Sequence, residues 1–118
     1  MASQDFTPKS LIIGSHPTVT GAVTLLTGTS YKKGAVLGKI TASGKYKLVD
    51  SAAVDGSQTP KYVLSADVDA TAADRPGIAY KTGQFNETLL TFGGVDTAAT
   101  HRDALEARGI FMDVLLPA

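Results

Sequence analysis

The sequence predicts a mainly β domain, a small β-barrel or β-sandwich, with one short helix in its C-terminal half. Short segments in which apolar and polar residues alternate recur along the chain, and glycine-rich or polar turns separate them. Only one segment combines helical spacing with helix-end residues. Leu, Ile, Val and Phe number 29 of the 118 residues, which is enough for one folded domain and argues against disorder.

Residues 1–17 are predicted to form a flexible N-terminal arm, and residues 18–118 a single β-rich domain. The arm is polar, and two prolines and a glycine interrupt any regular element in it. Its apolar centre is the run Leu11, Ile12 and Ile13. This run is too short for the apolar stretch of a secretory signal, so we expect a soluble protein that stays where it is made.

Three strands are predicted in the first half of the domain. Residues 19–25 alternate, with valine and leucine on one side of an extended chain and threonine and alanine on the other. A loop over residues 28–34 follows. Residues 36–41 and 45–49 are predicted to form a hairpin, because the Ala-Ser-Gly connection between them supplies a glycine where a tight turn needs positive φ.

Four further strands are predicted after the small, polar loop at residues 51–60. Alternation resumes at Lys61, and each later candidate is bounded by a polar segment, a glycine pair or a proline. The predicted strands are residues 61–68, 77–81, 87–92 and 110–116.

One helix is predicted over residues 96–108. Thr97 or Thr100 can cap its N-terminus, and Asp103 follows Thr100 at the spacing of a capping-box variant. Gly109 suits the position just after the last turn. A helix of about three turns is marginal alone in water, so it must be held by docking onto the sheet. The side chains expected to dock are Ala98, His101 and Leu105.

Charge and cysteine content exclude several classes of function. Eleven Lys and Arg balance eleven Asp and Glu, so no net charge attracts the protein to nucleic acid or to an anionic membrane surface. The chain has no cysteine, which excludes disulfides and thiolate zinc sites. No stretch approaches the roughly 18 apolar residues of a membrane helix. We therefore expect no nucleic-acid partner and no membrane partner.

One segment matches a catalytic motif. Residues 67–71 have the D-x-D-x-T spacing of aspartyl-phosphate phosphotransferases, in which the first carboxylate attacks phosphorus. That chemistry needs a magnesium-binding acidic pair and a lysine delivered by a doubly wound α/β sheet, which is a different fold class from the one predicted. A solvated acidic turn is the favoured interpretation of this segment.

The remaining candidate sites are incomplete. Three aspartates between residues 67 and 74 could gather calcium, but the glycine and distal glutamate of an EF-hand loop are missing. Residues 34–40 are one residue short of a phosphate-binding loop and lead into a strand. His16 and His101 have no cysteine to complete a zinc site. We therefore predict no catalytic residue, no cofactor and no metal.

Four segments resemble, in order, parts of one known family. The first runs from Tyr31 to Thr41 (Tyr-Lys-Lys-Gly-Ala-Val-Leu-Gly-Lys-Ile-Thr) and continues through Ala-Ser-Gly-Lys-Tyr at residues 42–46 to Leu48. The others are Pro-Gly-Ile-Ala at residues 76–79, residues 85–92 and residues 101–110. The series is similar to the head decoration protein family of tailed bacteriophages, the relatives of the lambda head protein D. The likeness runs from about Thr29 to Val114, with a polar arm in front, and departs from the lambda-type member in the lengths of the arm and of residues 49–60.

The resemblance implies a mainly β decoration-protein fold without enzymatic activity. It implies synthesis in the host bacterial cytoplasm and a final place in the virion, on the outer capsid surface. The implied partners are the major capsid protein and the chain itself, as a homotrimer. Such trimers would sit at three-fold and quasi-three-fold positions of an expanded capsid and clamp neighbouring capsid subunits against the pressure of packaged DNA.

Within this interpretation the arm would bind the capsid. An extended segment can add as a strand to a sheet edge, where backbone hydrogen bonds give affinity and apolar side chains fill pockets. The residues assigned to the capsid-binding arm are Phe6, Thr7, Pro8, Lys9, Leu11, Ile12 and Ile13.

Two other classes of function stay open on the sequence. One is a small soluble β-barrel binding or accessory module without a capsid role. The other is a hydrolase that uses Asp67. A monomer in solution would favour the first over a trimeric capsid protein, and phosphatase activity lost on replacing Asp67 by Asn would favour the second.

Overall fold

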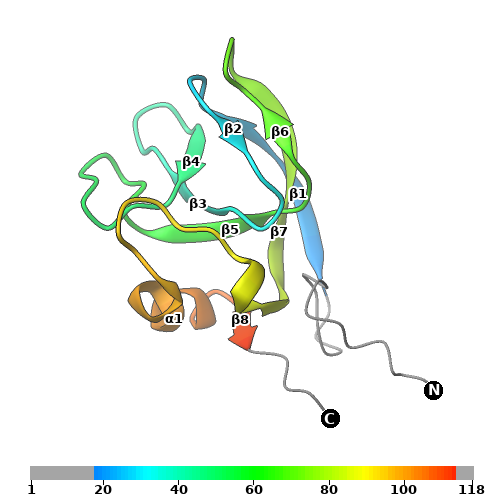
Figure 1. The fold of residues 1–118 in the computed structure, drawn as a ribbon, viewed down its shortest axis with the longest axis vertical. Coiled ribbons are helices and arrows are strands. Elements are labelled where there is room, and N and C mark those ends of the chain that lie inside the picture. The colour runs from blue at the N-terminus through cyan, green and yellow to red at the C-terminus, as the bar shows by residue number, and fades with distance from the viewer. Residues whose placement is uncertain (1–17, 114–118) are drawn as a thin grey trace, which may run out of the picture.

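The computed structural model describes residues 18–113, which form a five-stranded barrel with one helix packed outside it (Figure 1). The barrel strands follow the order β1-β4-β3-β5-β7, and β7 pairs back onto β1. The strands are β1 (Val19–Leu25), β2 (Ser30–Tyr31), β3 (Val36–Lys39), β4 (Tyr46–Leu48), β5 (Pro60–Leu64), β6 (Val68–Asp69), β7 (Arg75–Asn86) and β8 (Ile110–Asp113). The helices are the 3-10 helix η2 (Glu87–Leu89) and α1 (Ala98–Glu106). The prediction of a mainly β domain with one short late helix is confirmed.

Strand β7 pairs with three other strands. It pairs antiparallel with β1 along residues 75–82 and antiparallel with β5 at Tyr80 and Ala79. From Gly83 to Asn86 it pairs in parallel with β8. The prediction of a strand over residues 77–81 was therefore too short at both ends, because three different strands pair with successive parts of one 12-residue strand.

Two apolar cores lie on opposite faces of the barrel wall. The first fills the barrel and includes Leu37 and Leu64, both fully buried. The second lies between the outer face of the wall and α1 with β8, and it includes Val36 and Val63. Adjacent residues of β3 and β5 are thus buried on opposite faces, which explains why Val36 and Leu37, like Val63 and Leu64, are apolar in succession.

The first hairpin forms as predicted. Strands β3 and β4 pair antiparallel, and Gly44 in the connection has φ of +76° and donates its N–H to the carbonyl of Ile40. The predicted loop at residues 28–34 contains β2, which pairs with β6 in a separate two-stranded sheet. The predicted strand at residues 61–68 accordingly breaks after Leu64 into β5 and β6.

The predicted strand at residues 87–92 is wrong. Asn86 caps a turn of 3-10 helix there, since its Oδ1 accepts hydrogen bonds from the backbone N–H and the hydroxyl of Thr88. Leu90 and Phe92 pack against the outer core, and the segment pairs with the sheet only through a bridge between Ala35 and Thr91. Apolar spacing alone did not distinguish this docked turn from a strand.

Helix α1 is shorter than the predicted span of residues 96–108. Thr97 is the N-cap, and its backbone N–H donates to Oγ1 of Thr100 at 3.1 Å, so the pairing of Thr100 with Asp103 is not the cap. Gly109 has φ of +84° after the last turn, as predicted. The docking side chains are confirmed: His101 and Leu105 are buried and Ala98 packs against the outer core. Of the predicted final strand, residues 114–116 lie outside the described part of the chain.

Candidate functional site

The predicted capsid-binding arm lies outside the residues that the structure describes. This applies to Phe6, Thr7, Pro8, Lys9, Leu11, Ile12 and Ile13, and to His16. The assignment of residues 1–17 as an arm therefore stays a prediction.

The described chain begins and ends beside one strand. Val19, the first residue of β1, lies opposite Thr82 of β7, and the last residues of β8 lie opposite Phe85 and Asn86 of the same strand. At roughly 3.3 Å per residue, Thr82 and Asn86 are about 13 Å apart along β7. The N-terminal end of β1 and the C-terminal end of β8 therefore lie at one end of the molecule, which we call the exit pole (Figure 1).

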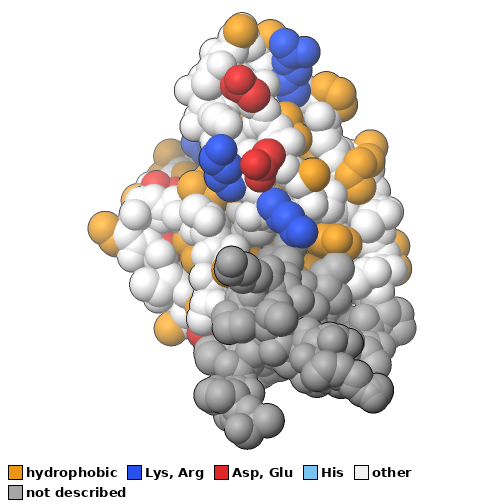
Figure 2. Space-filling view, turned by 45° about the vertical axis from the view of Figure 1, so that its right-hand side comes forward, with side chains coloured by type: hydrophobic (Ala, Val, Ile, Leu, Met, Phe, Trp, Pro, Cys, Tyr) orange, Lys and Arg blue, Asp and Glu red, His pale blue; other side chains and the backbone are white. Residues whose placement is uncertain are grey.

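The outer face of the β1–β7 pair carries no charge. Its outward residues face each other across the two strands, and Ile78 is 50% exposed opposite Ala22. Figure 2, in which this side of the molecule comes forward, shows hydrophobic side chains gathered along its right-hand edge. The other outward residues of this uncharged face are Thr20, Thr24 and Pro76. A surface of this kind can be buried against another protein without desolvating a charge.

The two aspartates of the D-x-D-x-T segment accept hydrogen bonds from nearby loop residues. Oδ1 of Asp67 accepts the backbone N–H of Lys33 at 2.7 Å. Oδ1 of Asp69 accepts both the N–H and the hydroxyl of Thr71, and these hydrogen bonds are the main cause that lowers the pKa of Asp69. Both carboxylates are exposed and have local structural roles, as expected for a solvated acidic segment. The segment is not a simple turn, because Val68–Asp69 form β6 and pair with β2.

The calcium and phosphate-loop alternatives gain no support from the geometry. Asp74 forms an ion pair with Lys45 and accepts the N–H of Thr27, and within residues 18–113 no group of three or more His, Asp or Glu side chains is placed to hold a metal ion. Gly34 donates its N–H to the carbonyl of Leu64, and the residues after it enter β3. The N–H groups of this segment therefore belong to the barrel and do not form an anion cradle.

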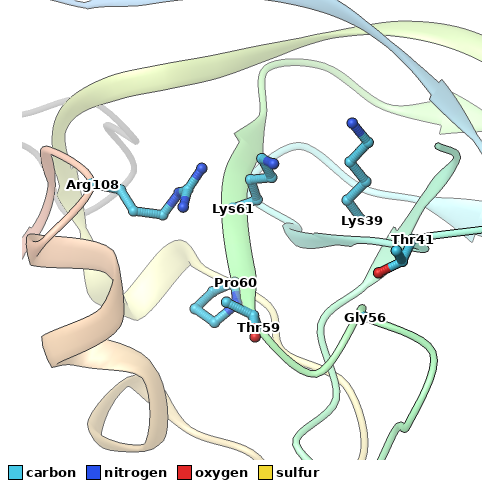
Figure 3. Close-up of a pocket in the computed structure, with 7 residues that line it drawn as sticks. All are labelled: Lys39, Thr41, Gly56, Thr59, Pro60, Lys61 and Arg108. Carbon is cyan, nitrogen blue, oxygen red and sulfur yellow. The ribbon is translucent and has the colours of Figure 1, made fainter.

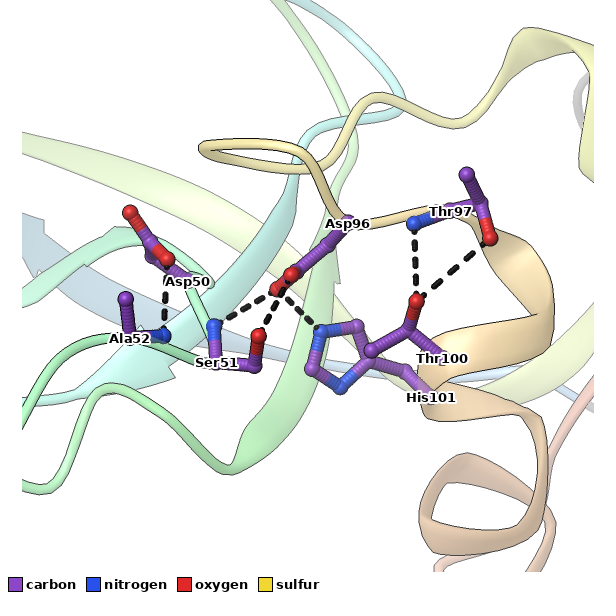
Figure 4. A network of polar contacts seen from close by, with 7 residues as sticks. All are labelled: Asp50, Ser51, Ala52, Asp96, Thr97, Thr100 and His101. Carbon is purple, nitrogen blue, oxygen red and sulfur yellow. Dashed lines mark hydrogen bonds and ion pairs between the residues drawn. The ribbon is translucent and has the colours of Figure 1, made fainter.

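His101 belongs to a buried polar network that ties α1 to a loop (Figure 4). Its Nε2 lies 2.7 Å from Oδ2 of Asp96, and its ring stacks on Phe92 with centroids 5.7 Å apart. Asp96 also accepts the backbone N–H and the hydroxyl of Ser51, each at 2.6 Å. The hydrogen bonds from Ser51, followed by that from His101, hold the pKa of Asp96 below its usual range.

A basic pocket is the feature that sequence reasoning missed. Lys39 at the end of β3, Lys61 in β5 and Arg108 after α1 line one hollow of about 310 Å³. Figure 3 shows Lys61 and Lys39 extending upward and Arg108 extending towards them from the left, each from a separate element. No local pattern could have indicated this pocket, because only the closure of the barrel and the docking of α1 bring the three residues together.

Comparison with known proteins gives the family. The model of the family described as bacteriophage lambda head decoration protein D matches residues 2–110. The chain belongs to this family. Comparison with curated protein sequences gives no match.

Membership of the head decoration family gives the chain a structural role in the virion. Head decoration proteins are non-enzymatic components of the capsid and lie on its surface. The hydrolase alternative and the alternative of a binding module without a capsid role are therefore both set aside.

Neither helix in residues 18–113 has the length and apolar character to cross a membrane.

The family assignment also explains why the described residues show no catalytic arrangement. Three features of residues 18–113 are surfaces that could contact a partner: the exit pole, the uncharged face and the basic pocket. A capsid-binding protein needs such surfaces, because it is attached to a shell by complementary shape and charge and not by a chemical reaction.

Proposed function

We propose that this head decoration protein assembles as a homotrimer and binds the outer surface of the expanded capsid. Trimers would occupy three-fold and quasi-three-fold positions and cement neighbouring subunits of the major capsid protein. The protein would be made in the cytoplasm of the bacterial host and act on the shell from outside. The observation that carries the proposal is the family match, which covers 109 residues from 2 to 110.

The uncharged face supports an interface with other protein. Three copies related by closed symmetry could bury this face between them, and buried apolar surface contributes roughly 25 cal/mol per Å² before the cost of association. The balance of charge over the whole chain also suits the proposal, because a decoration protein must pack against its own copies without strong electrostatic repulsion.

Residues 1–17 would act as the arm of this domain. We propose that Thr7 to Ile13 add as an extended strand to an edge of a capsid subunit, with Phe6, Leu11 and Ile13 filling pockets. Ordering the arm costs about 1 to 2 kcal/mol per residue, so a single arm binds weakly. Three arms on one trimer offset this cost, because the second and third attachments are intramolecular. The position of Val19 at the exit pole supports an arm that leaves the barrel at one end.

Mixing the purified protein with expanded and unexpanded capsid shells tests the proposal. Sedimentation should recover the protein with expanded shells and leave it in the supernatant with unexpanded shells. The mass in solution, from light scattering, should be three times that of the 12.2 kDa chain. Equal uptake by both shells, or by neither, would contradict the proposed role, and a monomer that binds expanded shells would remove the trimer from it.

A further inference from the structure

The basic pocket carries positive charge that its own chain does not neutralise. Elsewhere in the described residues, Lys45, Lys47 and Arg102 each form an ion pair with a carboxylate. Within residues 18–113 no Asp or Glu forms an ion pair with the three cations of the pocket. An incoming carboxylate would therefore meet three cations without breaking an existing ion pair.

The shape of the basic pocket also suits a ligand. Its volume of about 310 Å³ lies at the lower end of the range for ligand pockets, roughly 300 to 1,000 Å³. Pro60, which is buried, lines it together with the exposed residues Thr41 and Thr59. The hydroxyls of these threonines are hydrogen-bond donors, so the lining combines neutral donors with the cations and suits an anionic oxygen.

We propose that the basic pocket binds an acidic peptide segment of the capsid subunit through its carboxylates. This inference rests on the proposed function, and it adds a second contact of different chemistry to the contact made by the arm. Lysine and arginine with threonine hydroxyls form charge-assisted hydrogen bonds to carboxylates. Such a contact contributes mainly to the rate of encounter and to the choice of partner.

The position of the pocket links it to the exit pole. Arg108 is followed by Gly109, whose carbonyl accepts the N–H of Gly83 in β7 at 3.1 Å. The neighbouring residue of β7, Thr82, lies opposite Val19 at the start of β1. Val19 at the start of β1 and Arg108 of the pocket are therefore joined through two adjacent residues of β7, so one partner could contact this end of the molecule and the pocket together.

An aromatic pair beside the pocket argues against nucleic acid as the occupant. Tyr46 and Tyr62 stack on each other with centroids 5.6 Å apart, Tyr46 is 8% exposed, and Lys81 lies over the ring of Tyr62 at 5.6 Å. Single-stranded nucleic acid is held by basic grooves whose aromatic faces stack with bases. Here the tyrosine faces are occupied by each other and by Lys81, which leaves carboxylates as the better match.

Binding of defined anions to the full chain tests the chemistry of the pocket. Hexaglutamate, inorganic phosphate and an oligothymidylate of the same charge would be titrated by calorimetry at low salt. Hexaglutamate should bind best, and the variant with Lys39→Gln, Lys61→Gln and Arg108→Gln should bind it about tenfold more weakly. Tighter binding of phosphate or of the oligonucleotide, or an unchanged affinity of the variant, would overturn the proposal.

A matched variant separates the pocket from overall charge. Lys32→Gln, Lys33→Gln and Arg75→Gln remove the same charge from exposed positions outside the pocket and should change the affinity for hexaglutamate by less than about twofold. Equal losses in the two triple variants would overturn the proposal. A variant with Lys39→Arg and Lys61→Arg keeps the charge and should retain binding of hexaglutamate. Its binding would show that these positions tolerate substitution, so that the loss in the glutamine variant is due to the lost charge.

Capsid shells distinguish this inference from the proposed function. On expanded shells the pocket variant should have several-fold lower affinity and weaker salt dependence than the control variant. Normal shell binding by the pocket variant would overturn the inference and leave the decoration role intact. If the unaltered chain failed to bind shells but still bound hexaglutamate through the pocket, the proposed function would be overturned. The pocket would then remain a site for carboxylates, but not for a segment of the capsid subunit.

Discussion

Gly38 is required where a loop crosses the barrel wall. A Cβ at this position would lie 2.2 Å from the carbonyl oxygen of Ser57 and 2.7 Å from its Cα, both backbone atoms that cannot rotate away. We expect Gly38→Ala to lower the free energy of unfolding by about 2 kcal/mol, because overpacking of a rigid site typically costs about 1 to 3 kcal/mol. Urea denaturation followed by circular dichroism measures this change.

Gly21 provides the matched control for that substitution. A Cβ there would meet Cε of Lys81 at 2.5 Å, but this is the far part of a flexible side chain that can move. Gly21→Ala should therefore change the stability by less than about 0.5 kcal/mol. If the two alanine variants were equally stable, the close approach of Ser57 to β3 would not be the constraint described.

Asp96 makes the stability depend on acidic pH. Its pKa is held below the ordinary value of 3.8, so its contribution to stability is present above that value and is lost as the pH falls through the lowered pKa. Asp55, whose pKa is lowered to about 2 chiefly by its hydrogen bonds from Ser57, acts in the same direction. The unfolding free energy should fall as the pH drops from about 4 towards 2. In Asp96→Asn this fall should be shallower.

An exposed aspartate of α1, the helix that begins just after Asp96, is the control for this pH profile. Asp103→Asn should leave the acid limb of the stability curve as steep as in the unaltered protein. Chemical denaturation at a series of pH values measures both profiles. An acid limb in Asp96→Asn that is as steep as in the unaltered protein would show that the network of Asp96, Ser51 and His101 does not couple folding to protonation.

At the scale of the element, α1 depends on the outer core. Leu105 is fully buried against residues from the barrel wall and β8, so Leu105→Ala should cost about 3 kcal/mol through lost burial and a residual cavity. Glu106→Ala, on the exposed side of the same helix, should change stability by less than about 0.5 kcal/mol. Thermal unfolding measures both. A small effect at Leu105 would mean that the helix is not held by docking.

Several elements could be predicted from local pattern because each carries its own signal. Alternation indicated β1, the glycine of a tight turn indicated the hairpin of β3 and β4, and helix-end residues indicated α1. The segment at residues 87–92 could not, because its apolar side chains pack on the outer core from a 3-10 turn capped by Asn86. The small sheet of β2 and β6 depends on pairing between distant residues, which a local pattern does not reveal.

The candidate surfaces were predictable to different degrees. The acidic segment at residues 67–71 could be interpreted as solvated, because the fold class already excluded the chemistry of the motif, but its pairing as β6 could not be predicted as a turn. The basic pocket was not predictable, since Lys39, Lys61 and Arg108 are far apart in the sequence and meet only in the closed barrel. The uncharged face needed the register of β1 against β7, which a single sequence does not contain.

At the scale of the whole molecule, we expect the arm to be needed for binding to the shell and the barrel to be sufficient for folding. Deleting residues 2–13 should leave a soluble trimer that no longer binds expanded shells, because the proposed strand addition is lost while the described domain is intact. Light scattering and sedimentation with shells measure the two properties. Deletion variants that decorate expanded shells at full occupancy would contradict the role of the arm.

Two substitutions in the arm separate attachment from stability. Leu11→Asp combined with Ile13→Asp should weaken shell binding without lowering the melting temperature, since charged side chains would not enter apolar pockets on the capsid. Ser3→Asp combined with Gln4→Glu adds the same charge to the arm outside the assigned capsid-binding residues and should affect shell binding much less. A large fall in melting temperature in the aspartate variant would mean that the arm packs on its own domain.

The number of copies bound per shell tests the central claim most directly. Trimers at every three-fold and quasi-three-fold position of a closed shell contain as many chains as the shell has capsid subunits. Quantitative mass analysis of saturated, expanded shells should therefore give about one copy per major-capsid subunit, together with greater resistance of the shell to disruption. A saturating ratio far from one, or decorated shells that break as readily as bare ones, would contradict a cementing protein at these positions.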